Sequence, residues 1–170
     1  MLFRFRKMRS MDPLQVAMTG VRMGERYLQV FCTDAALTRG LATKTGLSGV
    51  AALAAFDESQ AKQARKAAEK AGVLLDLQVT SPTRLPWEEG AFDMVVVDNT
   101  GGGFRRLNDA ERSTSLHECR RVLRPGGRLE FIERSTEPSD ADAQLTAAGF
   151  KPVRALAERD GFRFVEGLKG

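Results

Sequence analysis

The chain has 170 residues, of which 42% are hydrophobic and 28% charged, a composition typical of a single globular domain with its own core. No apolar run approaches the roughly 18 residues that cross a bilayer, which excludes a membrane-spanning protein. The two cysteines, Cys32 and Cys119, show no metal-ligand spacing with the single histidine. We therefore expect free thiols, no metal site and a cytoplasmic location.

The net charge of +4 comes from the first residues of the chain. The basic residues that precede the first acidic one are Arg4, Arg6, Lys7 and Arg9. The rest of the chain is balanced, with 22 basic and 22 acidic side chains. Apolar residues alternate with the four cations, so residues 1–11 are interpreted as a basic amphipathic arm and residues 12–170 as one domain. The arm predicts contact with an anionic membrane surface or an acidic partner. Nucleic acid is not expected, because the basic residues of the domain lack interleaved aromatic side chains.

Capping residues, glycines and prolines divide the domain into alternating strands and helices. Strands are predicted over residues 26–32, 49–55, 73–79, 92–98 and 128–134. Helices are predicted to start at residues whose short side chains accept from backbone N–H groups, namely Asp12, Asp34, Asp57, Asn108 and Ser139. Near the C-terminus, strands over residues 150–158 and 162–168 flank Asp160-Gly161, a pair typical of a β-hairpin turn.

This order of elements predicts an α/β fold built on a doubly wound sheet. Five strands that alternate with helices favour a mostly parallel arrangement, because parallel neighbours need helical crossovers. The hairpin adds an antiparallel pair. Pro152 cannot donate a ladder hydrogen bond, so the sixth strand is expected at an edge and the seventh beside the fifth. The sequence therefore predicts one seven-stranded sheet.

Three stretches of the chain resemble a known family. They are GERYLQVFCTDAALTRGLA (24–42), LPWEEGAFDMVVVD (85–98) and RVLRPGGRLEFIE (121–133). Together they resemble the class I S-adenosylmethionine-dependent methyltransferases, and the resemblance extends over residues 12–169. It implies the strand order 3-2-1-4-5-7-6 and S-adenosylmethionine bound beyond the carboxyl ends of the first and fourth strands.

The resemblance also assigns the positions that would contact this cofactor. They are Gln29, Phe31, Thr33, Ala35, Ala55, Ser81, Asp98 and Asn99. The first four replace an acidic-x-Gly-x-Gly-x-Gly motif, and Thr33 is poorly suited to the positive φ that glycine adopts. Ala55 and Ser81 stand where the family has acids that contact ribose and adenine. Asp98 and Asn99 remain as polar groups near the substrate. These replacements predict impaired binding of S-adenosylmethionine.

Three hypotheses about function follow. Loss of the two charged contacts, at Gln29 and Ala55, would cost about 3 to 6 kcal/mol, or two to four decades of affinity. The leading hypothesis is thus a non-catalytic protein with a degenerate cofactor site, acting as a scaffold, a protein partner or a homo-oligomer. The first alternative is an active S-adenosylmethionine-dependent methyltransferase on a small molecule, with divergent cofactor contacts. The second is a peripheral membrane or assembly-docking module that uses residues 1–11.

A run of three glycines, Gly101 to Gly103, follows the fourth strand and precedes Arg105 and Arg106. Consecutive glycines allow the backbone to wrap around an anion. The same residues also suit a flexible loop with solvated arginines, and the sequence leaves both interpretations open.

Overall fold

A computed structural model describes residues 13–170. The predicted arm and its four cations, Arg4, Arg6, Lys7 and Arg9, lie outside the described residues. The helices are α1 (Pro13–Thr19), α2 (Ala35–Thr45), α3 (Glu58–Ala71), α4 (Asp109–Val122) and α5 (Ala141–Ala147). The strands are β1 (Arg26–Val30), β2 (Val50–Ala55), β3 (Leu75–Val79), β4 (Phe92–Asn99), β5 (Leu123–Arg134), β6 (Val153–Arg159) and β7 (Phe162–Leu168). None of the helices within residues 13–170 is both long enough and apolar enough to cross a membrane.

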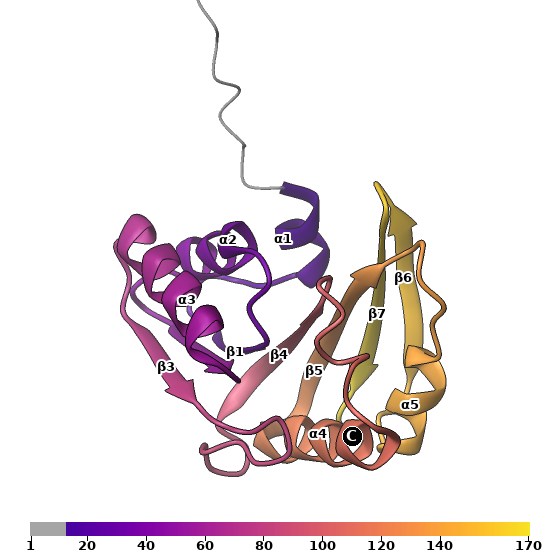
Figure 1. Cartoon of the computed structure of the whole chain (residues 1–170). Coiled ribbons are helices and arrows are strands. Elements are labelled where there is room, and N and C mark those ends of the chain that lie inside the picture. The colour runs from indigo at the N-terminus through magenta and orange to yellow at the C-terminus, as the bar shows by residue number, and fades with distance from the viewer. Residues whose placement is uncertain (1–12) are drawn as a thin grey trace, which may run out of the picture.

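All seven strands form one sheet in the order β3-β2-β1-β4-β5-β7-β6 (Figure 1). Strands β1 to β5 are parallel to one another, and β7 runs antiparallel between β5 and β6. Asp160 and Gly161, with φ values of 52° and 83°, make the tight turn of the β6–β7 hairpin. The predicted fold class and strand order are confirmed.

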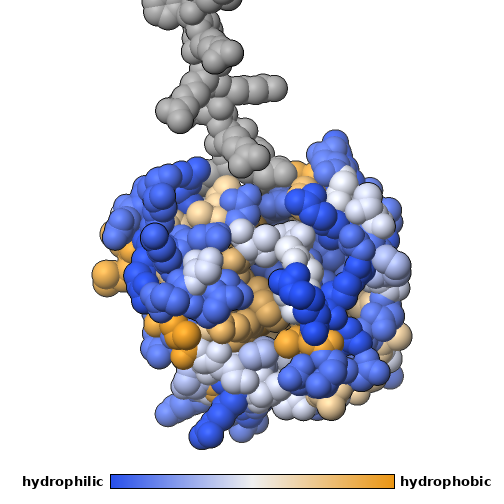
Figure 2. Space-filling view, in the orientation of Figure 1, coloured by the Kyte–Doolittle hydropathy of each residue, from blue (hydrophilic) through white to orange (hydrophobic). Residues whose placement is uncertain are grey.

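Helices cover both faces of the sheet, α4 and α5 on one and α1, α2 and α3 on the other (Figure 1). Val95 and Val97 of β4 belong to the same core cluster as Leu116 of α4. Val96, which points to the opposite face, belongs to a cluster with Leu41 of α2. The central strands are buried on both faces, as parallel strands require. The face seen in Figure 2 is mostly hydrophilic, with apolar residues gathered in its middle and at its left edge.

The structure departs from the predicted elements where two segments meet. Strand β1 ends at Val30, two residues earlier than expected, because Phe31 has a φ of 69°. Asp57 caps α3 by accepting from the Gln60 N–H at 2.8 Å, as predicted. The Gln60 side chain, however, accepts from the Cys32 N–H at 3.2 Å and so joins α3 to the end of β1.

Candidate functional site

The carboxyl ends of β1 and β4 lie side by side at the centre of the sheet. From β1 the chain continues towards β2 on one side of this point, whereas β4 continues towards β5 on the other. Ligands of open α/β sheets bind in the crevice at such a point. The two segments that line it here are the turn after β1, residues 31–34, and the loop after β4, residues 100–103.

Asp98 joins these two segments. Its side chain is fully buried, and its Oδ2 accepts from the Thr33 N–H at 3.1 Å. Its Oδ1 accepts from the Thr100 N–H at 3.1 Å and from the Thr100 hydroxyl at 2.6 Å. Burial raises the pKa of Asp98, while these hydrogen bonds act to lower it. Asp98 was expected to contact a ligand, but both of its oxygens already hold the protein's own backbone.

Phe31 occupies the first position of the turn. It is 5% exposed, and its ring meets that of Phe56 edge to face with centroids 4.6 Å apart. A Cβ atom on Gly103 would lie only 2.7 Å from the Phe31 ring, so the ring packs directly on the glycine backbone. Phe31, with its φ of 69°, adopts the conformation that glycine normally supplies. The positive φ of the turn was expected at Thr33. In the structure it falls on Phe31 instead.

The backbone N–H groups of the turn are engaged within the protein. The Phe31 N–H donates to the Ala54 carbonyl at 3.3 Å, and those of Cys32 and Thr33 donate to Gln60 and Asp98. Gln29 is fully buried and donates from Nε2 to the Phe31 carbonyl at 2.9 Å. Its Oε1 has no hydrogen-bond partner among residues 13–170.

The other predicted contact positions lie apart from this turn or beneath it. Ala55 is fully buried and packs in a cluster with Ala61 and Ala64 of α3. Ser81 is exposed, and its hydroxyl is hydrogen-bonded to that of Thr83 at 2.9 Å. Ala35 begins α2 and lines a separate cavity of about 170 Å³ between α2 and α3.

In this arrangement the described residues do not fit S-adenosylmethionine. Residues 101 and 103 of the loop lie against Thr33 and Phe31, where the methionyl end of the cofactor would enter. The N–H groups of residues 31, 32 and 33 are already used, and Ala55 offers no acceptor to a ribose. Among residues 13–170 there is also no cluster of three or more metal-binding side chains.

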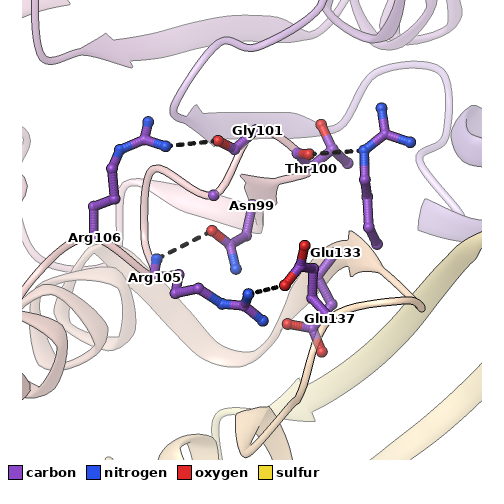
Figure 3. Close-up of a pocket in the computed structure, with 9 residues that line it drawn as sticks. Asn99, Thr100, Gly101, Arg105, Arg106, Glu133 and Glu137 are labelled. Carbon is purple, nitrogen blue, oxygen red and sulfur yellow. Dashed lines mark hydrogen bonds and ion pairs between the residues drawn. The ribbon is translucent and has the colours of Figure 1, made fainter.

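A pocket of about 350 Å³ opens on the other side of the same loop, at the carboxyl ends of β4 and β5 (Figure 3). The residues that line it are Asn99, Thr100, Gly101, Gly102, Arg105, Arg106, Glu133, Arg134 and Glu137. Sequence reasoning found the loop with its two arginines, and it missed Arg134. The available signal was the position of Arg134 as the last residue of the fifth strand, at the edge where ligands of this fold class bind.

Three arginines of this pocket hold the loop or its surroundings in place. Arg106 donates from Nη1 to the Gly101 carbonyl at 2.9 Å, and Arg134 donates from Nε to the Thr100 carbonyl at 3.2 Å. Arg105 forms an ion pair with Glu137 and donates to the Pro138 carbonyl. Arg105 and Arg106 therefore contact the protein and are not bonded to solvent alone.

A sequence model of the ubiE/COQ5 methyltransferase family matches residues 3–150. Among curated proteins, the chain is 26% identical over 144 residues to the "Ubiquinone/menaquinone biosynthesis C-methyltransferase UbiE" of Cupriavidus necator, which covers 85% of this chain and 57% of the relative. It is 32% identical over 120 residues to the protein of the same name from Bordetella avium. This alignment covers 71% of this chain and 45% of the relative. The chain spans about half the length of the curated relatives it matches.

Solved structures agree on the fold. A SAM-dependent methyltransferase from Aquifex aeolicus superposes with a TM-score of 0.77 at 19% identity, over 94% of this chain and 90% of the other. A SAM-dependent O-methyltransferase from Thermotoga maritima gives 0.69 at 16% identity, over 92% and 63%. At these identities the similarity concerns the fold alone.

The expectation of a non-catalytic scaffold or partner was wrong, because the matching family and the curated relatives are methyltransferases. The missing glycines do not mean that the turn after β1 is lost. Phe31 keeps the backbone conformation of a glycine although its side chain differs.

Proposed function

We propose that this chain, which belongs to the ubiE/COQ5 methyltransferase family, transfers a methyl group from S-adenosylmethionine to a small-molecule acceptor. The observation that carries the proposal is the family match over residues 3–150, which includes β1, β4 and the crevice between them. The names of the curated relatives favour carbon as the acceptor atom. We also retain the cytoplasmic location as part of the proposal.

Access of the cofactor requires the loop of residues 100–103 to leave the turn after β1. Loop and turn meet mainly through packing, of Gly101 on Thr33 and of Gly103 on the Phe31 ring. The bond from the Thr33 N–H runs to Asp98, which belongs to β4 and can stay in place when the loop moves. Opening thus costs packing contacts and the loop carbonyl bonds to Arg106 and Arg134. It also costs the two hydrogen bonds from Thr100 to Asp98.

Titration calorimetry of the full chain with S-adenosylmethionine and S-adenosylhomocysteine tests the proposal, together with transfer of a labelled methyl group. The variant Phe31→Gly keeps the backbone conformation and removes the ring from the crevice, so it should bind both compounds more tightly than the parent chain. Asp160→Gly is the matched control, since Asp160 is the other described non-glycine residue with positive φ and lies in the β6–β7 turn. It should leave cofactor affinity unchanged. Absence of binding to the parent chain and to Phe31→Gly alike would refute the proposal.

The N-terminal arm remains a proposed contact with an anionic membrane surface or an acidic partner. Its support is the clustering of Arg4, Arg6, Lys7 and Arg9 before the first acidic residue. Co-sedimentation with anionic vesicles, compared between the full chain and a chain without residues 1–10, measures its contribution.

A further inference from the structure

We propose that the pocket at the carboxyl ends of β4 and β5 binds the oxyanion, a carboxylate or a phosphate, of a small ring-sized acceptor molecule. The role as acceptor site rests on the proposed methyltransferase function. The oxyanion recognition stands on the charges, donors and size of the pocket itself.

The charges in the pocket do not balance. Glu137 is paired with Arg105, and Glu133, which is 4% exposed, is paired with Arg163 at 3.0 Å. Arg106 and Arg134 have no ion-pair partner among residues 13–170. Each of these two guanidinium groups donates one N–H to a loop carbonyl. Its remaining N–H groups are left for another acceptor. The pocket therefore presents two uncompensated positive charges.

Arg134 is held in position from a second side. Its guanidinium lies 5.5 Å from the centre of the Phe162 ring, a cation–π arrangement across the β5–β7 pair. With its Nε fixed by Thr100, the planar group is oriented before any ligand arrives. Preorganised arginine forks are well suited to carboxylate and phosphate groups.

Asn99 supplies a third, neutral donor. It is 7% exposed, and its Oδ1 accepts from the N–H groups of Phe104 at 3.0 Å and Arg105 at 3.2 Å. These two bonds fix which way the side-chain amide points, so the NH₂ group is the end left to donate. It has no partner among the described residues, and Figure 3 shows it directed into the pocket.

Size and lining limit the molecule that fits. A benzene molecule occupies a cavity of about 150 Å³, so 350 Å³ accommodates one ring together with a charged substituent. The nine lining residues are all Asn, Thr, Gly, Arg or Glu, and the aliphatic parts of the longer side chains supply surface that a ring can contact. The pocket therefore fits a compact acid with one ring.

The test compares three ring compounds by titration calorimetry at low ionic strength. Benzoate and phenyl phosphate carry the two oxyanions, and benzamide has the same ring without charge. Binding of benzoate or phenyl phosphate, with much weaker binding of benzamide, is expected, and the tighter of the two anions identifies the preferred oxyanion. Arg106→Gln and Arg134→Gln should each weaken that binding about tenfold or more, because each removes a charge-assisted hydrogen bond. Arg22→Gln is the matched control, because Arg22 is exposed before the amino end of β1 and changes the net charge equally.

Two results would overturn the inference. One is anion binding no tighter than that of benzamide, and the other is anion binding that survives the double variant Arg106→Gln/Arg134→Gln with an unchanged melting temperature. Titration of the same samples with S-adenosylhomocysteine separates this inference from the proposed function. If the proposed function is wrong and the oxyanion site is right, S-adenosylhomocysteine does not bind and benzoate still binds.

Discussion

The rings of Phe31 and Phe56 meet edge to face, with centroids 4.6 Å apart and an interplanar angle of 75°. Phe31 directly follows β1, and Phe56 directly follows β2, so the pair closes the ends of two neighbouring strands. This contact occupies a place where the family resemblance requires a backbone without side chains. It also stabilises a backbone conformation that an aromatic residue adopts only at a cost of about 1 to 2 kcal/mol.

Phe31→Gly should lower the free energy of unfolding by about 1 to 4 kcal/mol. Removal of a buried phenyl ring costs about 3 to 5 kcal/mol, and relief of the positive φ returns about 1 to 2 kcal/mol. Urea unfolding measures the change. Asp160→Gly, at an exposed turn, relieves the same kind of strain and should be neutral or stabilising. An equal loss of stability in both variants would show that the ring contact contributes nothing.

Gly101→Ala should loosen the loop from the turn. Its new Cβ would lie 2.6 Å from the Thr33 Cγ2 and 2.7 Å from its hydroxyl, so one of the two segments must shift. We expect a loss of about 1 to 3 kcal/mol, typical of overpacking, and faster hydrogen exchange at the Thr33 N–H. In the double variant Gly101→Ala/Thr33→Ala the obstacle is removed, and most of the stability should return. Additive effects of the two substitutions would contradict direct contact.

Glu130→Gln should reduce the dependence of the free energy of unfolding on pH between weakly acidic and alkaline conditions. Burial, followed by the hydrogen bond and negative charge of Glu166, raises the pKa of Glu130 to about 10. The folded state then binds one proton more than the unfolded state between the ordinary carboxyl pKa and about 10. Stability therefore falls as pH rises, by at most about 1.4 kcal/mol per pH unit. Urea unfolding at several pH values between 6 and 9 should show this slope in the parent chain and lose it in Glu130→Gln. Parallel profiles for the two chains would rule out a protonated Glu130.

Asp93→Asn should act at the opposite end of the pH scale. Burial alone would raise the pKa of Asp93, but hydrogen bonds from the Arg26 N–H at 2.8 Å, from the Arg26 side chain and from Arg124 at 2.7 Å outweigh it and bring the pKa to about 2. A lowered pKa contributes stability that is present above the ordinary value and is lost as pH falls towards 2. The parent chain should lose stability between pH 4 and 2 more steeply than Asp93→Asn. Thermal melts in that range measure the difference, and equal slopes would contradict it.

Periodicity and capping residues were sufficient to predict the helices, the strands and a doubly wound sheet, and the family resemblance supplied the strand order. The caps at Asp34, Asp57 and Asn108 lie where expected, because their bonds depend on residues only a few positions away. The positive φ of Phe31 could not be predicted in this way. Phe31 packs on Phe56 and Gly103, which are distant in sequence, so its surroundings depend on the tertiary fold.

The candidate site was only partly predictable for the same reason. Family positions identified Asp98 and Asn99, and the glycine run indicated the loop. Whether an oxygen is free or already bonded depends on tertiary placement, as the bond from Thr33 to Asp98 shows. Arg134 lies beside the loop after β4 because β5 pairs with β4, and this proximity depends on the tertiary fold.

The loop of residues 100–103 has the turn after β1 on one side and the arginine-lined pocket on the other. A ligand that displaces this segment from one side changes the free energy of binding on the opposite side, and such coupling is reciprocal. An acidic small molecule would then alter the affinity for the methyl donor by the same factor as the donor alters the affinity for the acid. One short loop would thus couple the two sites, so that a substitution in it changes both affinities together.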